Sequence, residues 1–108
     1  MSTYWETINT ETVDGFDIVL SVAPEDTDPR DHFDDAGETA QAIADGRYEW
    51  FMARVEAKRE GITLGADTLG ACCYANVRDF LNESDYYGSM RAYAVEEARA
   101  TIAKLAQA

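Results

Sequence analysis

The sequence predicts a single α+β domain in which an antiparallel sheet of about four strands carries helices packed on one face, in the order ββα-ββ-αα. Three observations lead to this class. Two N-terminal segments with strand-like composition flank an Asp-Gly pair, two central segments alternate apolar and polar residues, and the last third repeats apolar residues at helical spacing. A chain of 108 residues has the usual length of one domain.

The first two strands are predicted over residues 3–13 and 16–23. The first segment is rich in β-branched and aromatic residues. The second places a row of apolar side chains on one face: Phe16, Ile18, Leu20 and Val22. Asp14-Gly15 between them is typical of a two-residue hairpin turn, and Pro24 is expected to end the second strand.

A helix is predicted from residue 28 to residue 45, bent near Gly37. Asp28 stands before Pro29 and can cap this helix, and Gly46 is expected to end it. Spacings of three and four would align four acids in one stripe, with neighbours about 5–6 Å apart: Asp28, Asp31, Asp35 and Glu38. The opposite face would be apolar: Phe33, Ala36, Ala40 and Ile43.

Two more strands are predicted over residues 47–58 and 62–74, with a turn at residues 58–61 and a bulge or bend at Gly65 and Gly70. A short helix over residues 77–81, capped by Asn76, and a long helix beginning at Ser84 or Asp85 complete the chain. The long helix carries apolar residues at helical spacing: Met90, Ala94, Val95, Ala98, Ile102 and Leu105.

Negative charge is concentrated in the first half of the sequence. The chain has 9 basic and 21 acidic residues, a net charge of −12, and residues 1–46 hold 12 of the acids against one base, Arg30. The densest stretch runs from Glu25 to Glu38 and includes Asp26 and Asp34. An acidic run can also be an ordinary solvated face. The unequal distribution of charge between the two halves of the chain favours a functional role for this run. Such a chain is repelled by phosphate, so we expect no direct nucleic-acid binding and a cationic partner instead.

We expect a cytoplasmic protein without membrane contact. No apolar run approaches the length of about 18 residues that a membrane span needs, and the N-terminus lacks the basic start of a signal peptide. The acids from Asp26 onward match an EF-hand loop only at its first positions. His32 and the adjacent Cys72 and Cys73 form no recognisable catalytic or zinc-binding pattern. We therefore expect no enzymatic activity, catalytic residue, cofactor or metal.

Aromatic residues beside the acidic stretch have two interpretations. Tyr48, Trp50 and Met52 alternate along one side of the predicted third strand. They are either ordinary core under a helix or an exposed contact surface, since aromatic residues and methionine are enriched at interface centres.

The neutral half of the chain resembles a family of short, mostly uncharacterised bacteriophage and plasmid proteins. The resemblance covers residues 45–105, chiefly the segments 48–57, 61–65 and 69–74 and the pair Tyr86-Tyr87. The acidic half resembles, in character, the DNA-mimic inhibitors that include anti-CRISPR and anti-restriction proteins. The resemblance implies a binding protein encoded by a mobile element.

The leading hypothesis is therefore a phage inhibitor of a host defence system, and first an anti-CRISPR protein. Its acidic face would bind a basic, DNA-recognising surface of a CRISPR effector or a restriction enzyme subunit and exclude target DNA. The predicted contact residues are Glu25, Asp26, Asp28, Asp31, Asp34, Asp35, Glu38, Tyr48 and Trp50. The alternative is a non-inhibitory phage or plasmid interaction module that docks through its aromatic sheet face. A homodimer is compatible with either.

Overall fold

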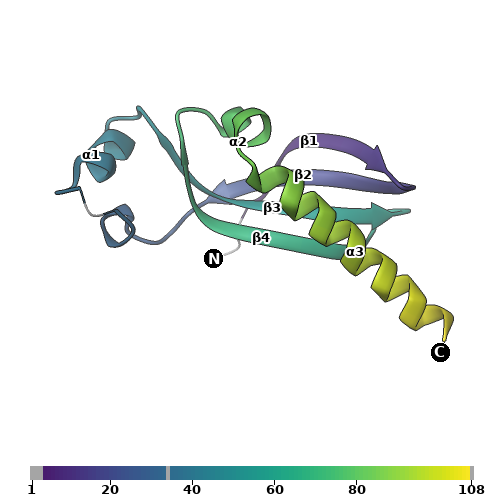
Figure 1. Cartoon of the computed structure of the whole chain (residues 1–108). Helices are drawn as coiled ribbons and strands as arrows, with labels where there is room; N and C mark the ends of the chain where they lie inside the picture. Colours follow the sequence, from purple (N-terminus) through teal and green to yellow (C-terminus); the bar gives the residue numbers. More distant parts are fainter. Residues whose placement is uncertain (1–3, 34, 108) are drawn as a thin grey trace.

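The computed structural model describes residues 4–33 and 35–107, and its centre is a four-stranded antiparallel sheet (Figure 1). The strands are β1 (Glu6–Val13), β2 (Phe16–Pro24), β3 (Glu49–Arg59) and β4 (Ile62–Tyr74), and they lie side by side in chain order. The predicted α+β class and the four strands are confirmed. None of the helices in the described ranges combines the length and apolar character that a membrane span requires.

Both hairpins are closed by two-residue turns with positive φ angles. Val13 pairs with Phe16 across Asp14 (φ 53°) and Gly15 (φ 82°), and Arg59 pairs with Ile62 across the equivalent Glu60-Gly61 turn. Two consecutive left-handed residues match the right-handed twist of the flanking strands. These turns set the register of β1 with β2 and of β3 with β4. The pairing of β2 with β3 aligns their alternating apolar residues on the same face, for example Leu20 with Val55.

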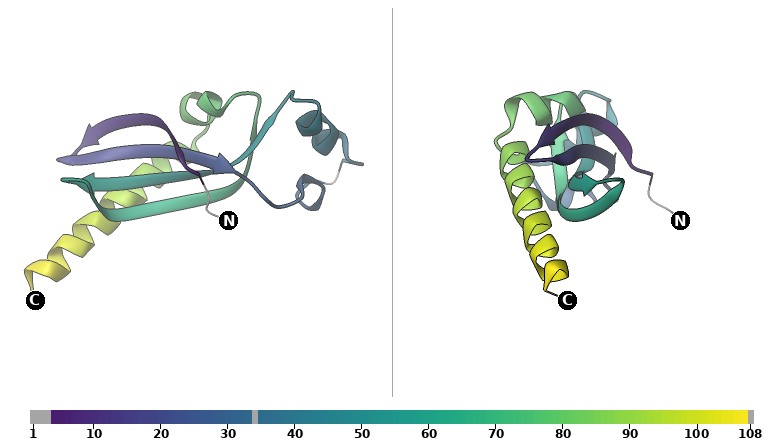
Figure 2. Two further views of the ribbon diagram at one scale, coloured as in Figure 1. Left: turned by 180° about the vertical axis from the view of Figure 1, so that it is seen from behind. Right: turned by 90° about the vertical axis from the view of Figure 1, so that its right-hand side faces the viewer.

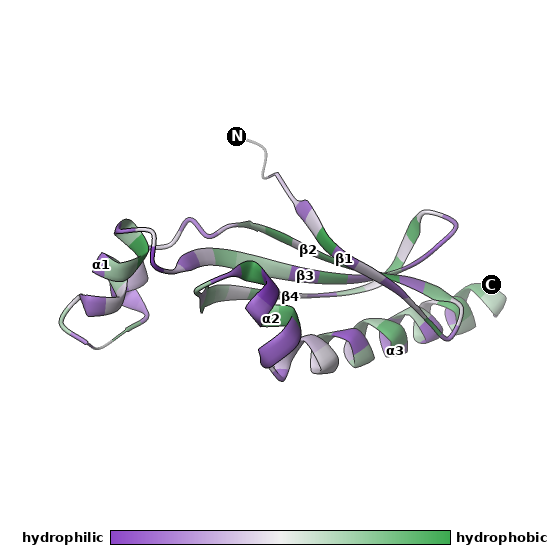
Figure 3. Ribbon diagram, turned by 90° about the horizontal axis from the view of Figure 1, so that it is seen from above, coloured by the Kyte–Doolittle hydropathy of each residue, from purple (hydrophilic) through white to green (hydrophobic). Residues whose placement is uncertain are grey.

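The core lies between this face and two C-terminal helices, α2 (Val77–Glu83) and α3 (Tyr86–Ala106). Asn76 caps α2 as predicted, because its side chain accepts a hydrogen bond from the Arg78 N–H, and the Ser84 hydroxyl accepts the first free N–H of α3. Figure 2 shows α3 standing against one side of the sheet, and Figure 3 shows hydrophilic and hydrophobic residues alternating along it. Its buried face contacts β3 and β4.

The prediction of one helix over residues 28–45 is wrong. The chain forms a single 3-10 turn, η1 (Pro29–Asp31), and a separate short helix, α1 (Glu38–Ala44). Ala36 (φ 57°) and Gly37 (φ 83°) both adopt left-handed conformations, which a continuous right-handed helix cannot contain. Gly46 does end α1 as predicted, with a positive φ and the paired backbone hydrogen bonds of a Schellman motif.

The segment between β2 and β3 projects past the end of the sheet instead of covering its face (Figure 1). We call residues 25–33 and 35–48 the acidic lobe. Of the residues of α1, only Ala42 is buried, so α1 adds little to the main core, and α2 and α3 cover the sheet face. The molecule is elongated as a result, with principal extents of 53 × 26 × 24 Å.

Candidate binding surface: the acidic lobe and its groove

Trp50 attaches the acidic lobe to the sheet. Its indole N–H donates a hydrogen bond of 2.9 Å to the Thr27 carbonyl oxygen, and the rings of His32 and Phe33 lie 5.4 and 5.7 Å from its own ring centre. The Thr27 hydroxyl in turn lies 3.1 Å from Nε2 of His32. Trp50, predicted as a partner contact, is therefore half-buried in a contact within the protein.

Glu25 is a second internal attachment. Its Oε1 accepts a hydrogen bond of 2.6 Å from the Ala71 N–H, at the bulge of β4, and its Oε2 accepts the N–H groups of Asp26 and Thr27. Burial raises the pKa of the Glu25 carboxyl, but these donors and the Thr27 hydroxyl outweigh it and hold the pKa below its ordinary value. Glu25 joins the start of the lobe to a strand that lies beyond β3.

Glu25→Gln is expected to lower the free energy of unfolding by about 1–2 kcal/mol at neutral pH, because an amide NH2 must face one of the backbone donors. The native pKa of Glu25 is lowered, so its carboxylate stabilises the fold above the ordinary value of 4.5, and this contribution disappears as pH falls. Urea unfolding from pH 7 to about pH 3 should show the difference between wild type and variant shrinking. Asp26→Asn is the control, because the exposed Asp26 carboxylate makes no hydrogen bond within the described chain. A difference that is constant across this range would contradict the assignment.

Asp28 and Asp35, both predicted contact residues, accept backbone N–H groups at the start of η1 and of α1. Asp28 accepts the Arg30 N–H and forms a 2.9 Å ion pair with the Arg30 guanidinium, and these contacts lower its pKa. Asp35 accepts both the hydroxyl and the N–H of Thr39 at the start of α1, and the hydroxyl contact is the main cause of its lowered pKa. Both carboxylates therefore remain ionised and are held in place.

Three predicted contact residues have exposed carboxylates that form no hydrogen bond within residues 4–33 and 35–107: Asp26, Asp31 and Glu38. Asp34 lies outside the described residues. The predicted stripe along one helix is replaced by carboxylates on two separate turns. The acids still share one lobe, since η1 and α1 contact each other.

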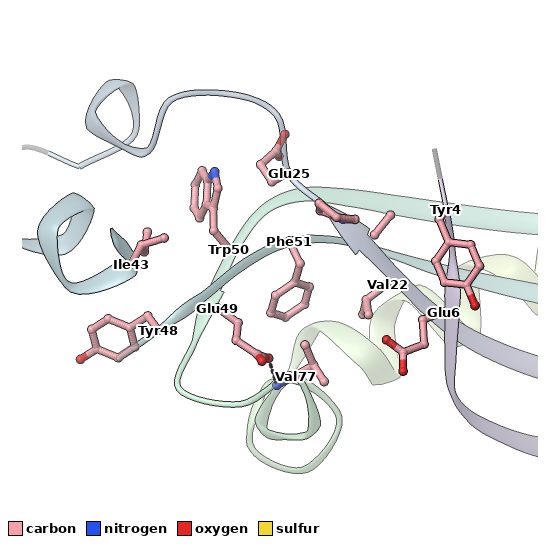
Figure 4. Close-up of a pocket in the computed structure, with 12 residues that line it drawn as sticks. Tyr4, Glu6, Val22, Glu25, Ile43, Tyr48, Glu49, Trp50, Phe51 and Val77 are labelled. Atoms are coloured by element: carbon pink, nitrogen blue, oxygen red, sulfur yellow. Dashed lines mark hydrogen bonds between the residues drawn. The ribbon is translucent and has the colours of Figure 1, made fainter. Parts of the chain in front are cut away.

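A groove of about 590 Å³ lies where the lobe meets the end of the sheet (Figure 4). One wall carries Tyr4 and Glu6, and the other carries Tyr48 and Glu49. Its remaining lining is mostly apolar: Val22, Ala23, Pro24, Glu25, Ile43, Trp50, Phe51 and Val77. Tyr4 and Tyr48 remain 78% and 42% exposed. Tyr48 is therefore an accessible surface residue, as the interpretation of these aromatic residues as a contact surface requires.

The groove was not predicted from the sequence because its walls come from residues more than forty positions apart. Within the groove, Oε2 of Glu49 accepts the Val77 N–H at 2.9 Å, which fixes the carboxylate against the start of α2. Glu6 is exposed and forms no hydrogen bond within the described chain. None of the described residues that line the groove is basic.

The two cysteines are free thiols on opposite faces of β4, as alternation predicts. Burial raises the pKa of the Cys72 thiol to about 11, and Cys73 is half-buried. Among the described residues, no three histidine, cysteine, aspartate or glutamate side chains are grouped so that they could hold a metal ion.

These features define an acidic α+β protein with a lobe fixed at one end of its sheet and an aromatic, carboxylate-bearing groove beside that lobe. Comparison with protein-family models, curated proteins and solved structures finds no match to the chain.

Proposed function

We propose that the chain is a non-enzymatic inhibitor that binds a basic, DNA-recognising surface of a host defence complex and excludes target DNA. The targets are a CRISPR effector, which we place first, and a restriction enzyme. One observation carries the proposal: the acids cluster in a lobe that projects past the sheet and is held by Trp50 and Glu25. Preorganised carboxylates bind without the cost of ordering a loop.

The charge density supports electrostatic mimicry of moderate strength. A net charge of −12 along 53 Å amounts to about one charge per 4–5 Å, against one per ~1.7 Å of duplex DNA. Charge alone would therefore give less affinity than DNA has for the same surface. Contacts other than charge must supply the rest, and the tyrosines beside the lobe are suited to that role.

The test is a plaque assay in bacterial strains that each carry one active CRISPR or restriction system. Asp31→Lys/Glu38→Lys is expected to lose the protection that wild-type protein gives an infecting phage. Each exposed charge contact contributes about 0.2–1 kcal/mol, and reversal replaces attraction with repulsion, so binding should weaken roughly 10–100-fold. Neither carboxylate forms a hydrogen bond within the described chain, unlike Asp35, whose reversal would remove its bonds to Thr39 at the start of α1.

The matched control is Glu60→Lys/Glu96→Lys, which changes net charge by the same amount at exposed positions on the β3–β4 turn and on α3. This control should keep full protection. Equal loss in both double variants would attribute the effect to net charge, and full activity of the lobe variant would overturn the proposal. Thermal melts establish that both variants fold.

The second candidate is a phage or plasmid interaction module without inhibitory activity, which docks through aromatic residues. The exposed Tyr48 ring favours it. Trp50→Ala cannot separate the two candidates, because Trp50 also attaches the lobe. Tyr48→Ala can: under this candidate it should abolish partner capture at high salt, while the lobe reversal leaves capture unchanged.

A further inference from the structure

The groove beside the acidic lobe contains aromatic rings and carboxylates, and elsewhere in the protein these two kinds of group together bind an arginine side chain. The Arg91 guanidinium lies 5.4 Å from the Tyr87 ring centre and 2.9 Å from a Glu11 carboxylate oxygen. Arg54 lies 4.3 Å from the Trp5 ring centre and 3.2 Å from a Glu56 carboxylate oxygen. In both places an aromatic ring and a carboxylate hold one planar cation.

Each wall of the groove carries the same two kinds of group, a tyrosine and a glutamate. Tyr4 with Glu6 forms one wall and Tyr48 with Glu49 the other, and Figure 4 shows Phe51 and Val22 between them. Two of the three carboxylates that line the groove are already held in direction, because Glu49 is fixed by the Val77 N–H and Glu25, at the rim, by the Ala71 N–H. Among the residues that the structure describes, no lysine or arginine lines the groove, so none of their side chains supplies a cation to its carboxylates.

We propose that this groove binds an arginine side chain presented by a basic segment of the protein partner. The proposal rests on the proposed function and specifies its partner chemistry. A guanidinium can stack on a tyrosine ring and bond a carboxylate at once, whereas a lysine ammonium lacks the planar face. The apolar floor suits the arginine methylene stem. A second copy of this chain is a poor occupant, because two molecules of net charge −12 repel each other.

The direct test is an NMR titration of the 15N-labelled full chain with the peptide acetyl-Gly-Arg-Gly-amide. Its counterparts contain citrulline, which is isosteric and neutral, or lysine. We expect saturable shift changes at the groove residues, with the citrulline peptide binding at least about 10-fold more weakly and the lysine peptide in between. Equal binding of the arginine and citrulline peptides, or shifts spread over the lobe and α3, would overturn the proposal.

Matched variants locate the site. Glu6→Gln and Tyr48→Ala should each weaken binding of the arginine peptide about 3–10-fold, because each removes one wall group. Glu96→Gln and Tyr93→Ala are the controls, since both side chains are exposed on α3, away from the groove, and Tyr93 is 54% exposed. Equal weakening in the controls would contradict the assignment.

Two further outcomes overturn the choice of occupant. Tighter binding of spermidine than of the arginine peptide would identify a small organic cation instead. Groove shifts that depend on protein concentration in the absence of peptide would identify a second copy. The plaque assay separates this inference from the proposed function. Arginine binding without protection of the phage would support the groove site and contradict the proposed function. Protection by Tyr48→Ala at the wild-type level would contradict the groove contact alone.

Discussion

Gly65→Ala should lower the melting temperature by roughly 10–20 °C. A Cβ at this position would lie 2.1 Å from the Ala94 carbonyl oxygen and 2.6 Å from the Ala98 nitrogen, both in the backbone of α3. The helix crosses β4 here with no space for a methyl group, and a backbone cannot rotate away as a side chain can. Overpacking costs about 1–3 kcal/mol, and a clash with fixed backbone belongs at the upper end of this range; each kcal/mol shifts the melting temperature by about 4–8 °C in a domain near this size.

Gly88→Ala is the matched control, because it makes the same chemical change within α3 at a position where an added Cβ meets no atom within 4 Å. It should leave stability unchanged or raise it by up to about 1 kcal/mol through helix propensity. Calorimetry of both variants measures the contrast. Melting temperatures that agree within a few degrees would mean that α3 does not approach β4 as closely as described.

Trp50→Ala should detach the acidic lobe while the sheet remains folded. The change removes the hydrogen bond to the Thr27 carbonyl and the ring contacts of His32 and Phe33. Since the Trp50 side chain is only half-buried, the loss of stability should be about 2–3 kcal/mol, below the 3–5 typical of fully buried aromatic residues. Hydrogen exchange should accelerate in residues 26–33 and remain slow in β2 and β3. Protection of phage should fall at least as far as in the lobe reversal.

Trp50→Phe separates the two contributions of this side chain. It keeps an aromatic ring beside His32 and Phe33 but has no N–H to donate, so about 1 kcal/mol should be lost. Tyr48→Ala is the control at a neighbouring exposed aromatic residue and should leave exchange in the lobe unchanged. Unaltered exchange of residues 26–33 in Trp50→Ala would contradict the role of Trp50 as an attachment.

In the acidic lobe, the start and stop signals of a helix were recognised correctly, but the single helix predicted between them was wrong. Asp28 and Pro29 do start a helical turn, and Gly46 does end one. Between them the Asp35 carboxylate bonds the Thr39 N–H, and this local alternative to helical bonding allows Ala36 and Gly37 to turn left-handed. An aspartate followed by glycine two positions later was the available signal for this break. The continuous acidic spacing favoured one helix instead.

Local chemistry determined what the sequence by itself could predict. The hairpin turn at Asp14-Gly15, the Asn76 cap and the Gly46 stop each depend on residues within a few positions of one another. The alternation of β2 and β3 likewise fixes which side chains face the core. These signals were sufficient for the α+β class and the strand boundaries to within a few residues.

Only the tertiary structure decided which carboxylates are free and where the groove lies. Glu25 bonds a backbone group 46 residues away, and Tyr4 shares a groove with Tyr48. Contacts of this kind depend on strand register and on the path of the lobe, which follow from the free energy of the whole fold and not from the propensity of any segment. The sequence therefore determined that the protein is acidic at one end, and its packing determined which acids can meet a partner.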